Sequence, residues 1–160
     1  IAAPAYMDDP EARETLLSQA VLKAGLERAG GVDVAVISVG EMNPSATTWS
    51  LGLLSQEDRM SLIEAGAVGD VLGHYINARG EVIDHPVNHR VVAMAPERLR
   101  HVERAILVAG GANKRAIIRA ALAGGYFNTF ITDEATATDL VTDVEPVSHV
   151  RLPSIAALPL

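Results

Sequence analysis

The sequence predicts an α/β fold in which helices cover both faces of a parallel sheet, a three-layer α/β/α Rossmann-like arrangement. Segments typical of strands alternate along the chain with helical patterns, as in βα units. The run at 106–109 is apolar throughout and that at 32–40 is rich in valine and isoleucine, as in strands buried on both faces. The 160 residues, 49% of them hydrophobic, are enough for one core.

The N-terminal part is predicted to contain a helix, a strand and a second helix. The stretch at 11–31 begins with acidic residues, has apolar residues at helical spacing and ends in glycines, which predicts one helix. A strand follows over 32–40 and a polar loop over 41–52. Ser55 and Asp58 have the spacing of an N-cap and its partner, so a helix is expected over 55–65.

The middle of the chain is predicted to form a β-hairpin, because alternating residues flank "NARG" at 77–80. A strand with the sequence "RVVAMA" and a short helix with the sequence "APERLRHV" come next. The strand at 106–109 then leads through a glycine pair into a helix that begins near Ala112 and stops at 124–125. The strand "FNTFITD" and the helix "EATATDLV" complete the pattern.

The glycine pair, Gly110 and Gly111, precedes a candidate anion site. Free backbone N–H groups at a helix start carry partial positive charge, and Lys114 in the first turn adds a full charge. This combination favours a phosphate or a carboxylate. The alternative is a tight connection between strand and helix, with Lys114 exposed to solvent. The stretch lacks the P-loop spacing and the full dinucleotide fingerprint.

Polar loops follow the predicted strands, at the edge where open parallel sheets usually bind ligands. They are "GEMNPSATT" after the first strand, the region around Asp70, "AGGANK" and "TDEATA". The Asp70 carboxylate could accept hydrogen bonds from two hydroxyls of a sugar, or the residue could simply turn the chain. Thr132, Asp133 and Glu134 are expected to cap and stabilise the last helix.

No catalytic centre, metal site or cofactor is expected. Asp84, His85 and His89 have the side chains of metal ligands, but a proline between the histidines disrupts a helical face and no third well-spaced ligand follows. Asn88 and Arg90 are expected to fasten the neighbouring strand. The sequence has no cysteine, which excludes a disulfide, a thiolate nucleophile and a thiolate metal site.

The composition argues against binding of nucleic acid or of a membrane by this segment. A formal net charge of −7 does not suit a phosphate backbone, and 4% aromatic residues leave few stacking platforms. No apolar run approaches the roughly 18 to 20 residues that cross a membrane. The start at Ile1 lacks signal-peptide features, so we expect a cytoplasmic protein, and it lacks a methionine, so we expect a piece of a longer one.

Four motifs carry a resemblance to a known family. In chain order they are "GAVGD" ending at Asp70, "G-x-x-x-DHP-x-N-x-R" at 80–90, "AGG-x-x-K" ending at Lys114, and "TDEATA" at 132–137. Together they resemble the C-terminal sugar-binding, or effector-binding, domain of SorC/DeoR-type transcriptional regulators. The resemblance covers residues 1 to about 141.

The resemblance implies a fold like that of phosphosugar isomerases and CoA-transferases, incomplete at the N-terminus, with 142–160 as a C-terminal tail. It implies a phosphorylated sugar or related metabolite as effector. Lys114 would contact its phosphate or hydroxyls, Asp70 would accept from its hydroxyls, and Gly110 and Gly111 would be further contacts. Operator DNA would be bound by a helix-turn-helix segment that these 160 residues lack, as they lack the family's glycine- and threonine-rich phosphate-binding loop.

Two alternatives stay open beside this sensor function. One is an enzyme similar to phosphosugar isomerases, because a shared fold does not determine activity. The other is an assembly module whose polar loops bind nothing. The expected function is not enzymatic. A sheet without its early strands exposes an edge, so a homo-oligomer is expected.

Overall fold

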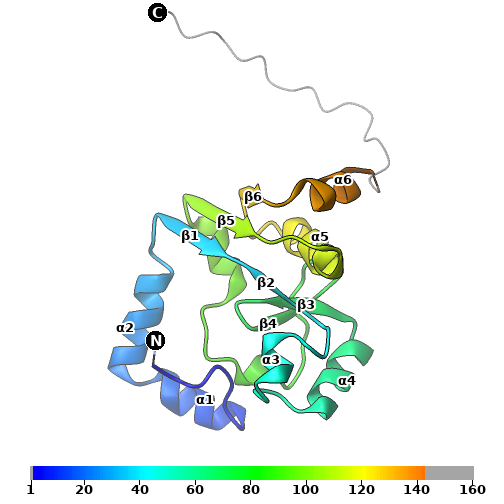
Figure 1. The fold of residues 1–160 in the computed structure, drawn as a ribbon. Coiled ribbons are helices and arrows are strands. Elements are labelled where there is room, and N and C mark those ends of the chain that lie inside the picture. Colours follow the sequence, from blue (N-terminus) through cyan, green and yellow to red (C-terminus); the bar gives the residue numbers. More distant parts are fainter. Residues whose placement is uncertain (1, 143–160) are drawn as a thin grey trace, which may run out of the picture.

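The computed structural model describes residues 2–142, and its strands form two sheets (Figure 1). One is parallel, with the order β1-β5-β6, and the other is antiparallel, with the order β2-β3-β4. The parallel sheet with its helices confirms the predicted α/β fold. The expected tail lies, from 143 onward, outside the described residues. The strands are β1 (Val34–Ile37), β2 (Val39–Glu41), β3 (Ala67–Val71), β4 (His74–Asn77), β5 (Arg104–Val108) and β6 (Thr129–Ile131).

Helices connect and cover these strands. The second predicted helix begins as expected, because the Ser55 hydroxyl accepts from the Asp58 N–H and the Asp58 carboxylate accepts from the Ser55 N–H. Within residues 2–142, no helix is both long and apolar enough to cross a membrane. The helices are α1 (Pro10–Leu17), α2 (Ala20–Ala29), α3 (Thr47–Ser50), α4 (Gln56–Glu64), α5 (Arg115–Ala123) and α6 (Glu134–Thr142), with 3₁₀ turns η1 (Asn88–Arg90), η2 (Pro96–His101) and η3 (Ala112–Lys114).

The single helix predicted over 11–31 is wrong, because the chain forms two helices with a break at Ser18 and Gln19. The Ser18 hydroxyl donates to the Thr15 carbonyl at 2.7 Å, and Gln19 has an extended backbone with ψ of 126°. A serine side chain that bonds to a nearby carbonyl competes with helix continuation. The apolar spacing runs through the break, so periodicity alone does not reveal it.

The strand predicted over 32–40 is in fact two strands in different sheets. β1 pairs with β5 in parallel, and after Ser38 the chain enters β2, which pairs antiparallel with β3. The division depends on which neighbour each half meets, and valine-rich sequence favours a strand in both halves. This switch places β2 and the loop after it beside the second sheet.

The strand predicted for "RVVAMA" is also wrong. Only Val91 forms a bridge, with Tyr6, and the surrounding backbone bonds run from Met7 N to Arg90 O and from Val92 N to Ala5 O. The N-terminal segment therefore pairs with this stretch through one isolated bridge and forms no strand. Val91 is buried, but this stretch forms no continuous ladder of strand hydrogen bonds.

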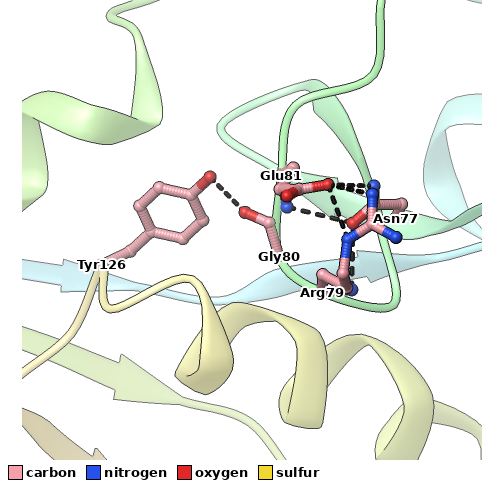
Figure 2. Close-up of polar contacts among 5 residues, drawn as sticks. All are labelled: Asn77, Arg79, Gly80, Glu81 and Tyr126. Atoms are coloured by element: carbon pink, nitrogen blue, oxygen red, sulfur yellow. Dashed lines mark hydrogen bonds and ion pairs between the residues drawn. The ribbon is translucent and has the colours of Figure 1, made fainter.

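The predicted turn at "NARG" is present and closes onto the end of α5. The Gly80 N–H donates to the Asn77 carbonyl at 2.9 Å, and the Arg79 guanidinium pairs with the Glu81 carboxylate at 2.6 Å. Figure 2 shows the Tyr126 hydroxyl donating to the Gly80 carbonyl from the other side. The second arm of the predicted hairpin is reduced to one bridge, and the regular hairpin is β3-β4.

The main core lies where α5 packs against the antiparallel sheet and the parallel sheet adds its inner face. Ile117 and Ile118 of α5 are fully buried with Val71 of β3 and Leu107 of β5. A second cluster, around Tyr75 and α4, fills the other side of the antiparallel sheet. Both clusters hold β2 and β3 in place next to the loop that carries the candidate site.

One face of the parallel sheet, expected to be covered by helices, is exposed in the described part of the chain. The strand register pairs Val36 with Ile106 and Val108 with Ile131, so these side chains share a face. Val36, Val108 and Ile131 are 64%, 39% and 52% exposed. We call this surface the apolar sheet face.

Candidate functional site

A polar cavity of about 400 Å³ opens between β2, the loop that follows it and the side chain of Lys114. Backbone groups and hydroxyl side chains dominate its lining. Lys114 supplies positive charge, and Glu41 supplies negative charge. The lining residues are Ser38, Val39, Gly40, Glu41, Ser45, Ala46, Thr47, Thr48 and Lys114.

Lys114 reaches the cavity from the turn that starts α5. It is the last residue of η3, and its Nζ donates to the Val39 carbonyl of β2 at 3.0 Å. An ammonium has three donors, so this bond leaves donors for a ligand. The neighbouring Asn113 side chain donates to the Glu41 carboxylate. Two consecutive side chains therefore fix the turn to β2, and Lys114 brings a positive charge to the cavity, while its role as a ligand contact stays a prediction.

Asp70 lies opposite Gly40 in the antiparallel sheet, on the same face. The register pairs the two residues, and a Cβ on Gly40 would lie 1.8 Å from the Asp70 Oδ1, so only glycine leaves room for this carboxylate. The other oxygen, Oδ2, accepts from the Gly73 N–H at 2.9 Å. Burial raises the pKa of Asp70, while the Gly73 N–H and the Lys114 charge oppose the rise. The structure thus brings Asp70 and Lys114 together around Gly40.

Gly110 and Gly111 are not among the residues that line this cavity, and they face the start of α6. Gly111 has a φ of 98°, which glycine adopts readily, and its N–H donates to the Thr136 hydroxyl at 2.8 Å and the Asp133 carboxylate at 3.2 Å. A Cβ on Gly110 would collide with the same carboxylate. The glycine pair shapes the turn, and its role as a ligand contact stays a prediction.

Of the two cap residues that the sequence predicted for the last helix, Asp133 acts as a cap, whereas the Thr132 hydroxyl has no hydrogen-bond partner within the described residues. The Asp133 carboxylate accepts from the Thr136 N–H at 2.8 Å and from its hydroxyl at 2.7 Å. These bonds lower the pKa of Asp133. The "TDEATA" loop therefore acts as a support for the glycine turn in this structure.

Sequence reasoning missed the individual hydroxyl groups of the cavity, although it selected their loop. Ser45 is held by the Asn43 side chain, which accepts from its N–H at 3.0 Å and from its hydroxyl at 2.9 Å. Thr47 and Thr48 belong to α3, which was predicted as loop. The signal was the density of serine and threonine after a buried strand, but four residues are too few for a helical period.

The candidate metal ligands have other partners. His85 Nδ1 accepts from the Val87 N–H at 3.2 Å, and His89 Nε2 pairs with the Asp84 carboxylate at 2.9 Å. Within the described range, no group of three or more His, Cys, Asp or Glu side chains could hold a metal ion. Arg90, expected to fasten a neighbouring strand, instead forms an ion pair with Asp58 of α4, 2.7 Å long.

All residues that the structure describes fall within a match to a known family. Residues 1–142 match the family described as "Putative sugar-binding domain". The chain is 30% identical over 141 residues to the deoxyribonucleoside regulator of Bacillus subtilis (strain 168), a match that covers 88% of this chain and 45% of that protein. It is 33% identical over 140 residues to the transcriptional regulator LsrR of Enterobacter sp. (strain 638), covering 86% and 43%.

The fold also matches solved structures. A DeoR family transcriptional regulator from Listeria monocytogenes superposes with a TM-score of 0.83 at 24% identity, covering 87% of this chain and 56% of that one. This likeness shows the shared fold. The chain spans a little under half the length of the curated relatives it matches.

Proposed function

The chain belongs to the sugar-binding domain family of SorC/DeoR-type transcriptional regulators, and from this membership we propose that its polar cavity binds a phosphorylated sugar that acts as an effector. The observation that carries the proposal is that Lys114 and Asp70 both meet β2, Lys114 at the Val39 carbonyl and Asp70 opposite Gly40. A cation and a hydroxyl acceptor that meet the same strand suit a ligand with an anionic end and a hydroxyl-rich end.

The cavity chemistry supports a polyhydroxylated ligand. Ser45, Thr47 and Thr48 offer hydroxyls that donate and accept, and Asp70 and Glu41 only accept when ionised. The volume of about 400 Å³ is within the range of small-molecule sites. Lys114 then binds the phosphate, and the carboxylates bind sugar hydroxyls.

We propose regulation of DNA binding as the outcome of this binding, with no chemical turnover. The matched relatives are named as transcriptional regulators. Operator DNA would be contacted by a separate helix-turn-helix segment, because this chain has a net charge of −7. The ligand shifts regulation only if it binds one conformation of the protein more tightly than the other.

Self-association of the domain is supported by the apolar sheet face. Val36 and Ile131 are more than half exposed there, and β1 is an edge strand. Contiguous exposed apolar surface is typical of interaction sites. The occupant that we propose is a second copy of this chain.

Calorimetric titration with sugar phosphates tests the proposed effector site. We would use ribose 5-phosphate, 2-deoxyribose 5-phosphate, glucose 6-phosphate and the corresponding free sugars. Lys114→Ala should abolish the preference for the phosphorylated form. Lys23→Ala is the matched control, because Lys23 is the other lysine of the sequence and lies exposed on α2.

Three outcomes would count against this assignment. Equal affinity of Lys114→Ala and Lys23→Ala would show that the anion binds elsewhere. Binding of no sugar phosphate by the wild-type chain would contradict the proposed function. Conversion of a bound sugar phosphate, lost in Asp70→Ala, would favour the enzyme alternative.

A further inference from the structure

We propose that Tyr75 and Trp49 form an inner subsite that binds a hydroxyl group of the ligand and so determines which sugar is accepted. The inference rests on the proposed sugar-phosphate function. It concerns the end of the ligand opposite Lys114. Three features of Tyr75 support it: its position in the sheet, its buried hydroxyl and its contact with Trp49.

The strand register places Tyr75 in line with the cavity. Gly40 of β2 pairs with Asp70 of β3, and Asp70 pairs with Tyr75 of β4, so the three residues form one row across one face of the antiparallel sheet. Gly40 lines the cavity at one end of this row. Thr48 of α3 also lines the cavity and is a polar neighbour of the Tyr75 hydroxyl. A ligand that reaches Asp70 from the cavity therefore approaches Tyr75 next.

The Tyr75 hydroxyl is buried without a regular hydrogen bond. Tyr75 is 1% exposed, and its hydroxyl, which lies near the Thr48 and Tyr6 hydroxyls, makes no hydrogen bond of regular geometry to any residue within 2–142. The nearby Tyr6 hydroxyl instead donates to the Gly73 carbonyl at 3.0 Å. A buried polar group without a partner is costly, so native proteins rarely retain one unless a bound molecule completes it.

Trp49 repeats the same feature beside Tyr75. Its Nε1 is buried and unpartnered in the described structure, and its ring lies 5.9 Å from the Tyr75 ring at an angle of 37°. Trp49 is a residue of α3, two positions after Thr47 in the cavity lining. These two groups belong to adjacent aromatic side chains next to the Asp70 carboxylate. They match a ligand hydroxyl that accepts from the Trp49 N–H and donates to the Tyr75 hydroxyl.

Tyr75→Phe tests the inner subsite without removing a structural bond. We would first identify the sugar phosphate that binds wild type most tightly, and then measure its affinity and that of inorganic phosphate by calorimetry. Loss of one ligand hydrogen bond should weaken the sugar phosphate about tenfold. Inorganic phosphate, which reaches only the Lys114 end, should bind within about twofold of wild type. The same pattern is expected for Trp49→Phe.

Tyr126→Phe is the matched control for the aromatic substitution. The Tyr126 hydroxyl is also buried, but it donates to the Gly80 carbonyl (Figure 2). This variant should lower the Tm by about 2 to 4 °C and leave ligand affinity unchanged. Tyr75→Phe should show the reverse, with an unchanged or higher Tm and weaker binding of the sugar phosphate.

The emission of Trp49, the only tryptophan of the sequence, provides a second readout. The best sugar phosphate should change this emission, and inorganic phosphate should not. Unchanged affinity in Tyr75→Phe, with binding intact in wild type, would overturn the inner subsite alone. Failure of every sugar phosphate to bind wild type would overturn the proposed function and the subsite with it.

Discussion

The Asn88 side chain hydrogen-bonds to both backbone groups of Tyr75. Its side-chain Oδ1 accepts from the Tyr75 N–H at 2.7 Å, and its Nδ2 donates to the Tyr75 carbonyl at 2.9 Å. The same Nδ2 donates to the Ile83 carbonyl at 2.8 Å. All these groups are buried, so the "DHP-x-N-x-R" motif positions the strand that carries Tyr75.

Asn88→Asp should destabilise the fold by about 2 to 4 kcal/mol, because it replaces the donor with an oxygen that faces two carbonyls. Urea denaturation followed by circular dichroism measures the loss. His89→Asn is the control, since the His89 side chain is 54% exposed and should cost less than about 0.5 kcal/mol. Equal stability of Asn88→Asp and wild type would contradict this role of Asn88 in positioning Tyr75.

Asp70→Asn should stabilise the chain at neutral pH while weakening the binding of the sugar. Burial raises the pKa of Asp70 above its ordinary value of 3.8, so its stability contribution is complete below that pH and is lost as the pH rises through the raised pKa. Asparagine keeps an acceptor for the Gly73 N–H and carries no charge. The Tm gain of the variant should be present at pH 7 and vanish below about pH 4. A gain independent of pH would refute this cause.

His85 should make the fold sensitive to mild acid. Burial lowers the pKa of His85 below its ordinary value of 6.5, and Nδ1 accepts from the Val87 N–H. Its stability contribution is complete above pH 6.5 and is lost as the pH falls toward the lowered pKa. His85→Asn retains an acceptor without titrating. The fall in Tm between pH 7 and pH 5 should therefore be smaller in this variant than in wild type, and an identical fall would count against the account.

The apolar sheet face should mediate self-association. Val36→Lys places a charge where a second copy would pack, so it should shift sedimentation-velocity profiles toward the monomer. Val21→Lys is the control, because Val21 is 84% exposed on α2, away from this face. A wild-type chain that sediments as a monomer at all concentrations would contradict the proposed homo-oligomer.

Local sequence patterns predicted most of the elements but not their partners. The Ser55 capping box and the strand ending at Val108 depend on neighbouring residues, and both were predictable. The change of sheet at Ser38 depends on pairing with β3, which lies about 30 residues away along the chain. The antiparallel sheet was for this reason only partly anticipated.

The candidate residues Lys114 and Asp70 could be selected from charge and chain position, and their role in binding stays a prediction. Lys114 lies in the turn after β5, as expected, whereas Asp70, expected in a loop, lies within β3 of the antiparallel sheet. Both residues meet β2, at Val39 and Gly40. Tyr75 and Trp49 gave no such signal, because a buried aromatic residue is usually part of a core. Their unpaired polar atoms are visible only when the surroundings are known.

The central claim, that Lys114 binds the anionic end of a sugar phosphate, is tested most directly by NMR of the chain labelled with ¹³C at the lysine ε-carbons. The sequence has two lysines, Lys23 and Lys114, so the spectrum contains two signals that single substitutions assign. Titration with the sugar phosphate should shift the Lys114 signal and leave that of Lys23 in place. A ligand that binds by calorimetry while the Lys114 signal stays fixed would contradict the claim.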